Sequence, residues 1–305
     1  MTDSARGVVV ATFSRRMTVH LDDGQVVQAR IKGKKLKAVC ADRVVLSPIE
    51  NEEDWLIDSS LPRTNELSRP DNRGRREVLA SNLDTVVVVA ALRPKPDWFI
   101  VDRYIAAAEN IGAEPIVVLN KIDLTHDQTD LEPLADYHQC DYPVVVTSAS
   151  SGQGLDELAS ALTEQTTIIV GQSGVGKSSI INALVEDAEQ KTAEISGSTG
   201  EGKHTTVNSV MLKMPDGACV IDSPGVRDFA PAINSVDEVI RGFREISQKG
   251  DECRFGNCRH LQEPDCAVKA AVETGDIAAR RYDSFKRLFN IARQYVEKST
   301  PGRLR

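Results

Sequence analysis

Short apolar runs rich in β-branched residues, each bounded by turn residues, occupy the first sixty positions. They lie at residues 8–12, 17–21, 26–31, 43–46 and 55–57. Asp23-Gly24 separates the second run from the third. This pair is a strong hairpin signal, because both central positions of the tight turn take a positive φ. Five short strands predict a small OB-fold barrel over residues 1–65, an architecture that often binds RNA.

The pattern changes after the barrel. Residues 61–76 carry two prolines, five arginines and no apolar periodicity, so we expect a linker over 66–80. Beyond it, strand-like and helix-like stretches alternate, which predicts an α/β domain over 81–232 with a parallel sheet covered by helices on both faces. In such sheets ligands bind at the carboxyl ends of the strands. The strand-like runs are 85–89, 116–119, 144–147 and 167–170, and the helix-like ones are 101–111 and 155–162.

Composition limits the classes of function. The 305 residues are 41% hydrophobic and 27% charged, as in ordinary globular proteins. The longest apolar run, 86–92, is far shorter than the roughly 20 residues of a membrane-spanning helix. The N-terminus has no signal-like apolar stretch. We therefore expect a cytoplasmic protein with no membrane partner.

The net charge of −8 is unevenly distributed. Residues 1–47 hold nine Lys and Arg against four Asp and Glu, and residues 277–305 hold eight against two. These basic ends are candidate RNA contacts. On the expected C-terminal helix, the basic residues are Arg280, Arg281, Lys286, Arg287 and Arg293, and the neighbouring apolar residues, which either pack in a core or stack on bases, are Tyr282, Phe285, Leu288 and Phe289.

A glycine-rich sequence, GQSGVGKS at 171–178, follows one strand-like run and precedes helix-like residues. It matches a Walker A phosphate loop, in which backbone N–H groups surround the phosphates, Lys177 reaches the β and γ oxygens and Ser178 binds Mg²⁺. The alternative is a simple glycine-rich turn. The expected nucleotide contacts here are Gly171, Gln172, Ser173, Gly174, Val175, Gly176, Lys177, Ser178 and Ser179.

Asn120-Lys121-Ile122-Asp123 follows the run 116–119 and indicates guanine. The Asp123 carboxylate can accept hydrogen bonds from N1–H and the exocyclic amine of guanine, whereas adenine offers an acceptor at N1 and no such amine. Asn120 would connect neighbouring loops, and Lys121 would lie along the base. The alternative is that Asp123 is only a helix N-cap.

Two further strand ends carry candidate contacts. Ser148-Ala149 lies about 25 residues after the guanine motif, where the Ala149 N–H can meet guanine O6. Asp222-Ser223-Pro224-Gly225 ends the apolar run 218–221. Asp222 would hold a Mg²⁺ water, and the Gly225 N–H would face the γ-phosphate.

The stretch 197–206, GSTGEGKHTT, has the composition of a switch segment. A threonine here would complete the Mg²⁺ shell; we favour Thr205, with Thr206 as the alternative. Val226 follows Asp-x-x-Gly, where Ras-like proteins place a water-orienting glutamine, so intrinsic turnover should be slow. We expect His204 to be catalytic, unless it is only a solvated loop residue.

The order of the motifs identifies a circularly permuted GTPase. The guanine motif and Ser-Ala come first, and the phosphate loop, the switch threonines and Asp-x-x-Gly follow. Most GTPases begin with the phosphate loop. Such a permutation is tolerated because domain termini are often close together.

Cys253, Cys258, His260 and Cys266 are separated by four, one and five residues. Three thiolates and one imidazole suit a closed, structural zinc site within residues 233–305. The alternative is a set of core or redox residues. We expect the other cysteines to be buried apolar residues.

Together, the strand-rich N-terminus, the permuted motifs, GKHTT at 202–206, DSPGVR at 222–227 and the cysteine cluster resemble the bacterial RsgA (YjeQ) family of GTPases. The resemblance implies an OB-fold, a permuted P-loop GTPase and a mostly helical zinc domain. It also implies a monomer that binds GTP or GDP and the small ribosomal subunit with its rRNA, acts late in subunit assembly and is released after subunit-stimulated hydrolysis.

This chain departs from the family pattern at two places. Ser223 stands where threonine is usual, and Cys40-Ala41-Asp42 replaces Val-Gly-Asp in the barrel. Two alternatives remain: a permuted GTPase of large-subunit assembly, and a zinc-containing RNA-binding scaffold with weak hydrolysis.

Overall fold

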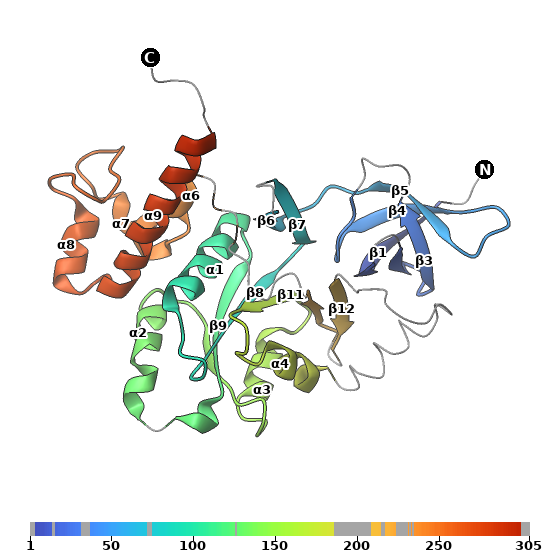
Figure 1. The fold of residues 1–305 in the computed structure, drawn as a ribbon, viewed down its shortest axis with the longest axis horizontal. Helices are drawn as coiled ribbons and strands as arrows, with labels where there is room; N and C mark the ends of the chain where they lie inside the picture. Colours follow the sequence, from blue (N-terminus) through green and yellow to red (C-terminus); the bar gives the residue numbers. More distant parts are fainter. Residues whose placement is uncertain are drawn as a thin grey trace, which may run out of the picture.

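The computed structural model describes residues 4–13, 16–31, 37–71, 75–125, 127–185, 209–214, 217–223, 231, 233 and 235–299. Figure 1 shows a β-barrel at the N-terminal end, a central α/β domain and a helical module that ends in a long helix. None of the helices in these ranges is long and apolar enough to cross a membrane.

The N-terminal barrel contains the five predicted strands. They are β1 (Ala5–Thr12), β2 (Met17–Leu21), β3 (Val26–Ile31), β4 (Arg43–Pro48) and β5 (Trp55–Ser60). The strand order is β1-β2-β3-β5-β4, and β4 pairs back with β1, which closes the barrel. Its core includes Val9, Val19, Val44 and Ile57. The predicted hairpin is confirmed, but its turn differs, since Gly24 has a positive φ of 91° and Asp23 does not.

The segment expected as a linker forms a β-hairpin instead. Strands β6 (Glu66–Pro70) and β7 (Arg76–Ser81) pair antiparallel. Leu67 and Ala80 are buried, while the charged side chains form ion pairs between the strands, such as Arg69 with Glu77. The sequence favours a linker here because prolines and charged residues interrupt the short apolar stretches of this hairpin.

A buried carboxylate joins the barrel to this hairpin. Asp42, only 1% exposed, accepts hydrogen bonds from the Arg63 guanidinium (2.7 and 2.8 Å) and the Ser81 hydroxyl (2.7 Å). The preceding Ala41 has a φ of 68°, a left-handed conformation that favours glycine. The glycine that the family pattern has at position 41 therefore suits this conformation, and Ala41 adopts the same conformation here.

The central sheet has the predicted parallel strands. They are β8 (Thr85–Ala91), β9 (Glu114–Asn120), β10 (Val144–Val146), β11 (Thr166–Gly171) and β13 (Cys219–Asp222), and antiparallel β12 (Ser209–Lys213) lies beyond β13. The order is β10-β9-β8-β11-β13-β12. Strand β12 also pairs with β1 of the barrel, so one continuous sheet runs through both domains.

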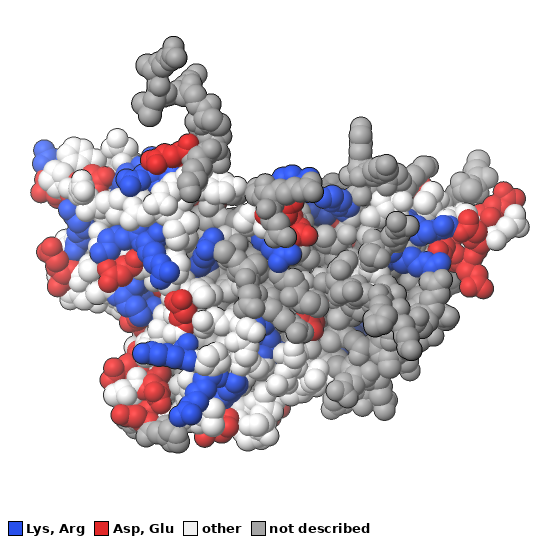
Figure 2. All heavy atoms as spheres, viewed as in Figure 1, with Lys and Arg blue, Asp and Glu red and all other residues white. Residues whose placement is uncertain are grey.

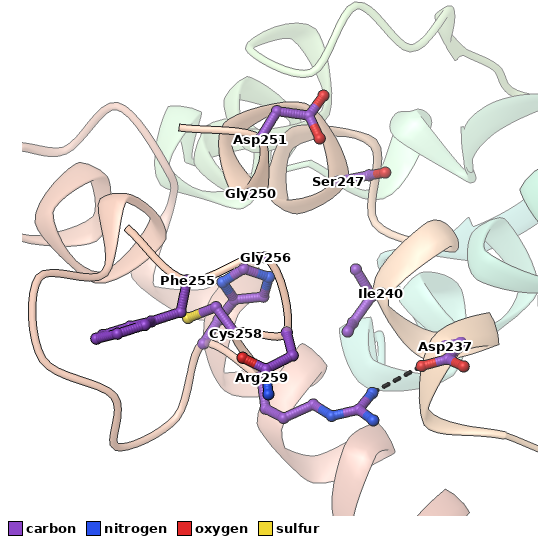
Figure 3. Close-up of a pocket in the computed structure, with 11 residues that line it drawn as sticks. Asp237, Ile240, Ser247, Gly250, Asp251, Phe255, Gly256, Cys258 and Arg259 are labelled. Carbon is purple, nitrogen blue, oxygen red and sulfur yellow. Dashed lines mark hydrogen bonds and ion pairs between the residues drawn. The ribbon is translucent and has the colours of Figure 1, made fainter. Parts of the chain in front are cut away.

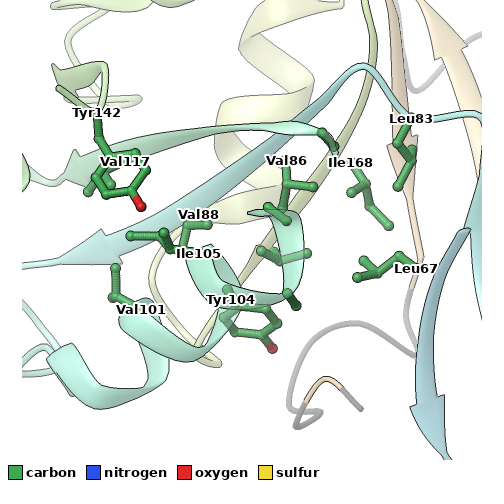
Figure 4. Packing of buried hydrophobic residues seen from close by; sticks show 14 of the residues in the cluster. Leu67, Leu83, Val86, Val88, Val101, Tyr104, Ile105, Val117, Tyr142 and Ile168 are labelled. Carbon is green, nitrogen blue, oxygen red and sulfur yellow. The ribbon is translucent and has the colours of Figure 1, made fainter. Parts of the chain in front are cut away.

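Helices cover both faces of this sheet, as predicted. They are α1 (Trp98–Ile111), α2 (Glu132–His138), α3 (Leu155–Ala161) and α4 (Lys177–Leu184), with short 3₁₀ turns η1 (Ile122–Leu124) and η2 (Gln128–Leu131). Alternate residues of β8 face opposite cores. Val86 and Val88 pack against Ile105 of α1 (Figure 4), whereas Val87 and Val89 belong to the core with α3 and α4.

The C-terminal module contains α6 (Val236–Arg241), α7 (Arg244–Gly250), α8 (Ala267–Thr274) and α9 (Ala279–Ser299). Phe285, Leu288 and Phe289 are buried in its core, so the packing interpretation of these residues is confirmed. The expected basic face of α9 is wrong for Arg280 and Arg281, because both turn inward and bind Asp102 of α1.

Candidate nucleotide and metal sites

The glycine-rich loop curls from the end of β11 into the start of α4. Gly171 and Gly176 have positive φ values of 140° and 94°. A Cβ on Gly171 would clash with the Val89 carbonyl, and a Cβ on Gly176 would clash with the Asn120 amide. Lys177 is 9% exposed, and its Nζ donates to the carbonyls of Gly171 (2.7 Å) and Gln172 (2.6 Å). The loop thus has the compact backbone that a phosphate-binding loop requires.

Asn120, the last residue of β9, connects three loops. Its Nδ2 donates to the Val175 carbonyl (2.9 Å) of the phosphate loop. Its Oδ1 accepts from the Thr147 hydroxyl and from the Ala149 N–H, both at 3.2 Å. The expected bridging contacts of Asn120 are therefore present, and the 120–123 motif lies directly beside the phosphate loop.

Lys121 and Asp123 extend this arrangement. Lys121 has a φ of 63°, and its Nζ donates to the carbonyls of Gly174 and Arg93, both at 2.7 Å. Asp123 is exposed, and its Oδ1 accepts from the Ser148 hydroxyl at 2.6 Å. An exposed carboxylate held in place from one side keeps acceptor capacity for a ligand.

The residues expected at the phosphate end are only partly described. Ser178 and Ser179 are exposed on the first turn of α4. Asp222 ends β13, and the buried Ser223 beside it accepts a hydrogen bond from the Ser209 hydroxyl at 2.8 Å. The other expected residues, His204, Thr205, Thr206 and Gly225, lie outside the described residues.

Sequence reasoning missed two contacts that position the phosphate loop. The Gln172 side chain accepts from the Asp97 N–H at the start of α1 (3.0 Å), and the Arg93 carbonyl accepts from Lys121. Both come from the loop that follows β8. Its place after a parallel strand was the available signal, since the carboxyl ends of parallel strands lie at one edge.

The four expected metal ligands form one compact cluster. Their donor atoms all lie within 4.8 Å of one another. The Nδ1 of His260 is 3.5 Å from the Cys253 sulfur and 3.6 Å from the Cys266 sulfur, and these two sulfurs are 3.9 Å apart. Tetrahedral zinc has edges of roughly 3.6 Å between sulfur and nitrogen and roughly 3.8 Å between sulfurs. Three thiols and an imidazole at this spacing fit zinc in a closed, structural site.

The surrounding contacts hold this cluster in shape. The Tyr282 hydroxyl donates to the His260 carbonyl (2.6 Å), and a Cβ on Gly250 would lie only 3.2 Å from the imidazole, so a larger residue there would press on the ligand. Burial raises the pKa of Cys258 to about 12, so a cation is needed to favour its thiolate at neutral pH.

Glu263 was not predicted from the sequence, yet it organises the metal-binding loop. Its carboxylate accepts from the N–H groups of Arg259 (3.0 Å), Leu261 (3.0 Å) and Gln262 (3.1 Å). Burial alone would raise the pKa of Glu263, but these hydrogen bonds lower it to about 2. A glutamate between two metal ligands was a weak signal because its role depends on loop geometry.

A cavity of about 380 Å³ lies beside this loop, between α6 and the end of α7 (Figure 3). Arg259 and Asp237 form an ion pair at its edge, 2.7 Å apart. The cavity also borders Cys258 and His260, so it is a feature of the metal-binding loop and lies away from the glycine-rich loop.

Comparisons with known proteins point to one family. The family model for the RsgA GTPase matches residues 60–231. The chain is 37% identical over 294 residues to the small ribosomal subunit biogenesis GTPase RsgA of Pectobacterium carotovorum, covering 94% of this chain and 84% of that protein. It is 39% identical over 286 residues to the RsgA of Pseudomonas aeruginosa, covering 92% and 84%.

Two solved structures have the same fold along most of their length. The crystal structure of YjeQ from Thermotoga maritima has a TM-score of 0.75 and 32% identity, and the match covers 95% of this chain and 99% of that one. YloQ, described as a circularly permuted GTPase, has a TM-score of 0.73 and 26% identity, with coverage of 98% and 97%. The permuted fold predicted from the motif order is therefore confirmed.

Proposed function

Since this chain belongs to the RsgA GTPase family and is a GTPase, we propose that it serves in assembly of the small ribosomal subunit. It binds the subunit in its GTP form and leaves after hydrolysis. The names of the relatives support the choice of the small subunit as partner. One observation supports GTP as the nucleotide: Asn120 joins the phosphate loop to the loop of Ala149, beside Asp123. This arrangement brings base and phosphate contacts to one edge of the sheet.

In this proposal the guanine binds between the loops that Asn120 connects. Asp123 accepts from the base, and the Ala149 N–H donates to O6. Lys177 exchanges its loop carbonyls for phosphate oxygens. Magnesium, which GTPases use, would be held by Ser178, Thr205 and Asp222, and His204 would orient the attacking water once the protein is bound to the subunit.

The remaining modules serve the ribosome. Zinc bound by the Cys₃His cluster keeps the C-terminal module folded and supplies no chemistry to hydrolysis. The barrel contacts rRNA with its basic residues, and the protein acts as a cytoplasmic monomer. Continuity of the sheet from β13 through β12 to β1 supports a functional connection between nucleotide and barrel.

Turnover of GTP and ATP, measured with and without each purified ribosomal subunit, tests this function. We expect slow hydrolysis of GTP, clear stimulation by the small subunit and little turnover of ATP. Stimulation by the large subunit alone would assign the protein to the other subunit. Equal affinity for GTP and ATP would overturn the base assignment.

Replacing Asp123 with asparagine gives a sharper test of the base. Xanthine carries a carbonyl where guanine has its amine, so an amide donor should suit it and the carboxylate should not. We expect Asp123→Asn to lose GTP turnover and to gain turnover of xanthosine triphosphate. The matched control is Asp127→Asn, which lies on the same loop and caps η2 through the Thr129 N–H. Retention of full GTP turnover by Asp123→Asn would contradict the proposal.

A further inference from the structure

Two arginines meet where α1 of the GTPase domain packs against α9 of the C-terminal module. The guanidinium carbon of Arg287 lies 3.8 Å from the centroid of the Phe99 ring. Phe99 and Arg103 are four residues apart on α1, so they lie on the same face of that helix. Arg287 is thereby placed beside Arg103, although it comes from another module.

The positive charge of this pair is not balanced within the described part of the chain. Arg103 donates one hydrogen bond, from Nη2 to the Pro231 carbonyl (3.2 Å), and its buried Nε has no partner there. Neither Arg103 nor Arg287 forms an ion pair with a described carboxylate. Burial lowers the pKa of Arg103, and repulsion from Arg287 lowers it further.

Other basic residues of α9 behave differently. Arg280 binds Asp102 and Asp136, and Lys286 binds Asp283 at 2.7 Å. Arg293 lies 3.8 Å from Glu297. Arg103 and Arg287 differ from these residues because their guanidinium groups lie side by side and neither has a carboxylate partner among the described residues. An anion that binds between two such groups stabilises the arrangement.

We propose that Arg103 and Arg287 together bind a phosphate of the RNA backbone, as a two-arginine clamp at the seam between α1 and α9. This clamp rests on the proposed function, because it specifies one contact with the small subunit's rRNA. Guanidinium groups bind phosphate oxygens through paired N–H donors, and the Phe99 ring limits the orientations of Arg287. Lys and Arg side chains, with some Asp and Glu among them, also lie over α9 on the face seen in Figure 2.

The location gives the clamp a role beyond affinity. One arginine belongs to each module, so a bound phosphate would hold the two modules together. Arg103 also contacts Pro231, on the chain that leads from the end of β13 to the C-terminal module. Through this contact with Pro231, RNA binding at Arg103 would be connected to the segment that follows Asp222 in the chain.

The test is binding of the full-length protein, with a non-hydrolysable GTP analogue, to small subunits and to protein-free small-subunit rRNA across a salt series. We expect Arg287→Gln to bind both probes about tenfold more weakly at low salt. The slope of log K against log salt should also fall by about 0.7–0.9 for the one lost phosphate contact. Arg287→Lys should recover part of the affinity, and intrinsic GTP turnover should not change.

Arg293→Gln is the matched control, because Arg293 is an exposed arginine on the same helix that already has a carboxylate neighbour. We expect it to bind like the wild type. If the wild type binds neither probe, the proposed function fails. If the wild type binds and Arg287→Gln binds equally tightly with the same slope, only the clamp fails. Weaker binding to the subunit without weaker binding to free rRNA would identify an acidic protein partner and also overturn the clamp.

Discussion

Replacing Arg281 with methionine tests what holds the GTPase domain and the C-terminal module together. Arg281 is fully buried. Its guanidinium binds Asp102 of α1 at 2.8 Å and both oxygens of Glu245 of α7 at 2.9 and 3.0 Å. Asp102 keeps Arg280 and the Tyr137 hydroxyl as partners in the variant, whereas Glu245 loses its bidentate partner. We expect a loss of about 3–5 kcal/mol in the free energy of unfolding, the usual cost of an unpaired buried charge.

Urea unfolding of the zinc-loaded protein at neutral pH measures this loss. Arg293→Met is the control, because its ion pair is exposed on both sides and should contribute less than about 1 kcal/mol. Adding Glu245→Met to Arg281→Met should recover part of the loss, since no buried charge is then left without a partner. If Arg281→Met costs no more than Arg293→Met, or if the double variant is less stable than the single one, the reasoning is refuted.

Three further predictions concern backbone conformation and the metal loop. Gly176→Ala should reduce GTP affinity at least tenfold in a titration with a fluorescent nucleotide, because the methyl group displaces the Asn120 amide and a φ of 94° strains alanine. Glu164→Gly should raise the free energy of unfolding by about 0.5–1 kcal/mol, since exposed Glu164 has a φ of 59°. Glu263→Gln should speed zinc release to a chelator several-fold at pH 7, as a neutral amide holds the loop N–H groups less strongly; an unchanged rate would contradict this role.

Most of the fold was predictable because its signals are local. The barrel strands and the parallel strands are β-branched runs, and their burial follows directly from that pattern. The elements that were missed depend on distant partners. The hairpin β6–β7 mixes charged residues with short apolar stretches, and the short strand β12 lies between β13 and the barrel strand β1. No local pattern shows which strand from another domain will pair with an edge.

The candidate sites divide in the same way. Asn120, Lys177 and the four metal ligands follow from spacing, because each motif encodes a loop geometry in consecutive residues. Arg281 could not be placed from the sequence, since its partner on α1, Asp102, lies 179 residues earlier. A basic residue on an amphipathic helix looks the same in sequence whether it faces RNA or a buried carboxylate.

The nucleotide site therefore has two structural routes to the rest of the molecule. On one side, Gln172 holds the start of α1, and α1 carries Asp102, which binds Arg281 of the C-terminal module. On the other side, Ser223 at the end of β13 binds Ser209 at the start of β12.

These two routes differ in strength. The first ends in a buried ion network, so a shift of α1 must carry the C-terminal module with it. Among the described residues, the second crosses to the barrel through two residue pairs between β12 and β1, while the Asp42–Arg63 ion pair anchors the barrel to the hairpin. Loss of the β1–β12 pairing would leave the pairing of β1 with β2 and β4 intact, so it would not by itself unfold the barrel. We therefore expect the C-terminal module to move together with α1, and the barrel to be the part that can change its orientation.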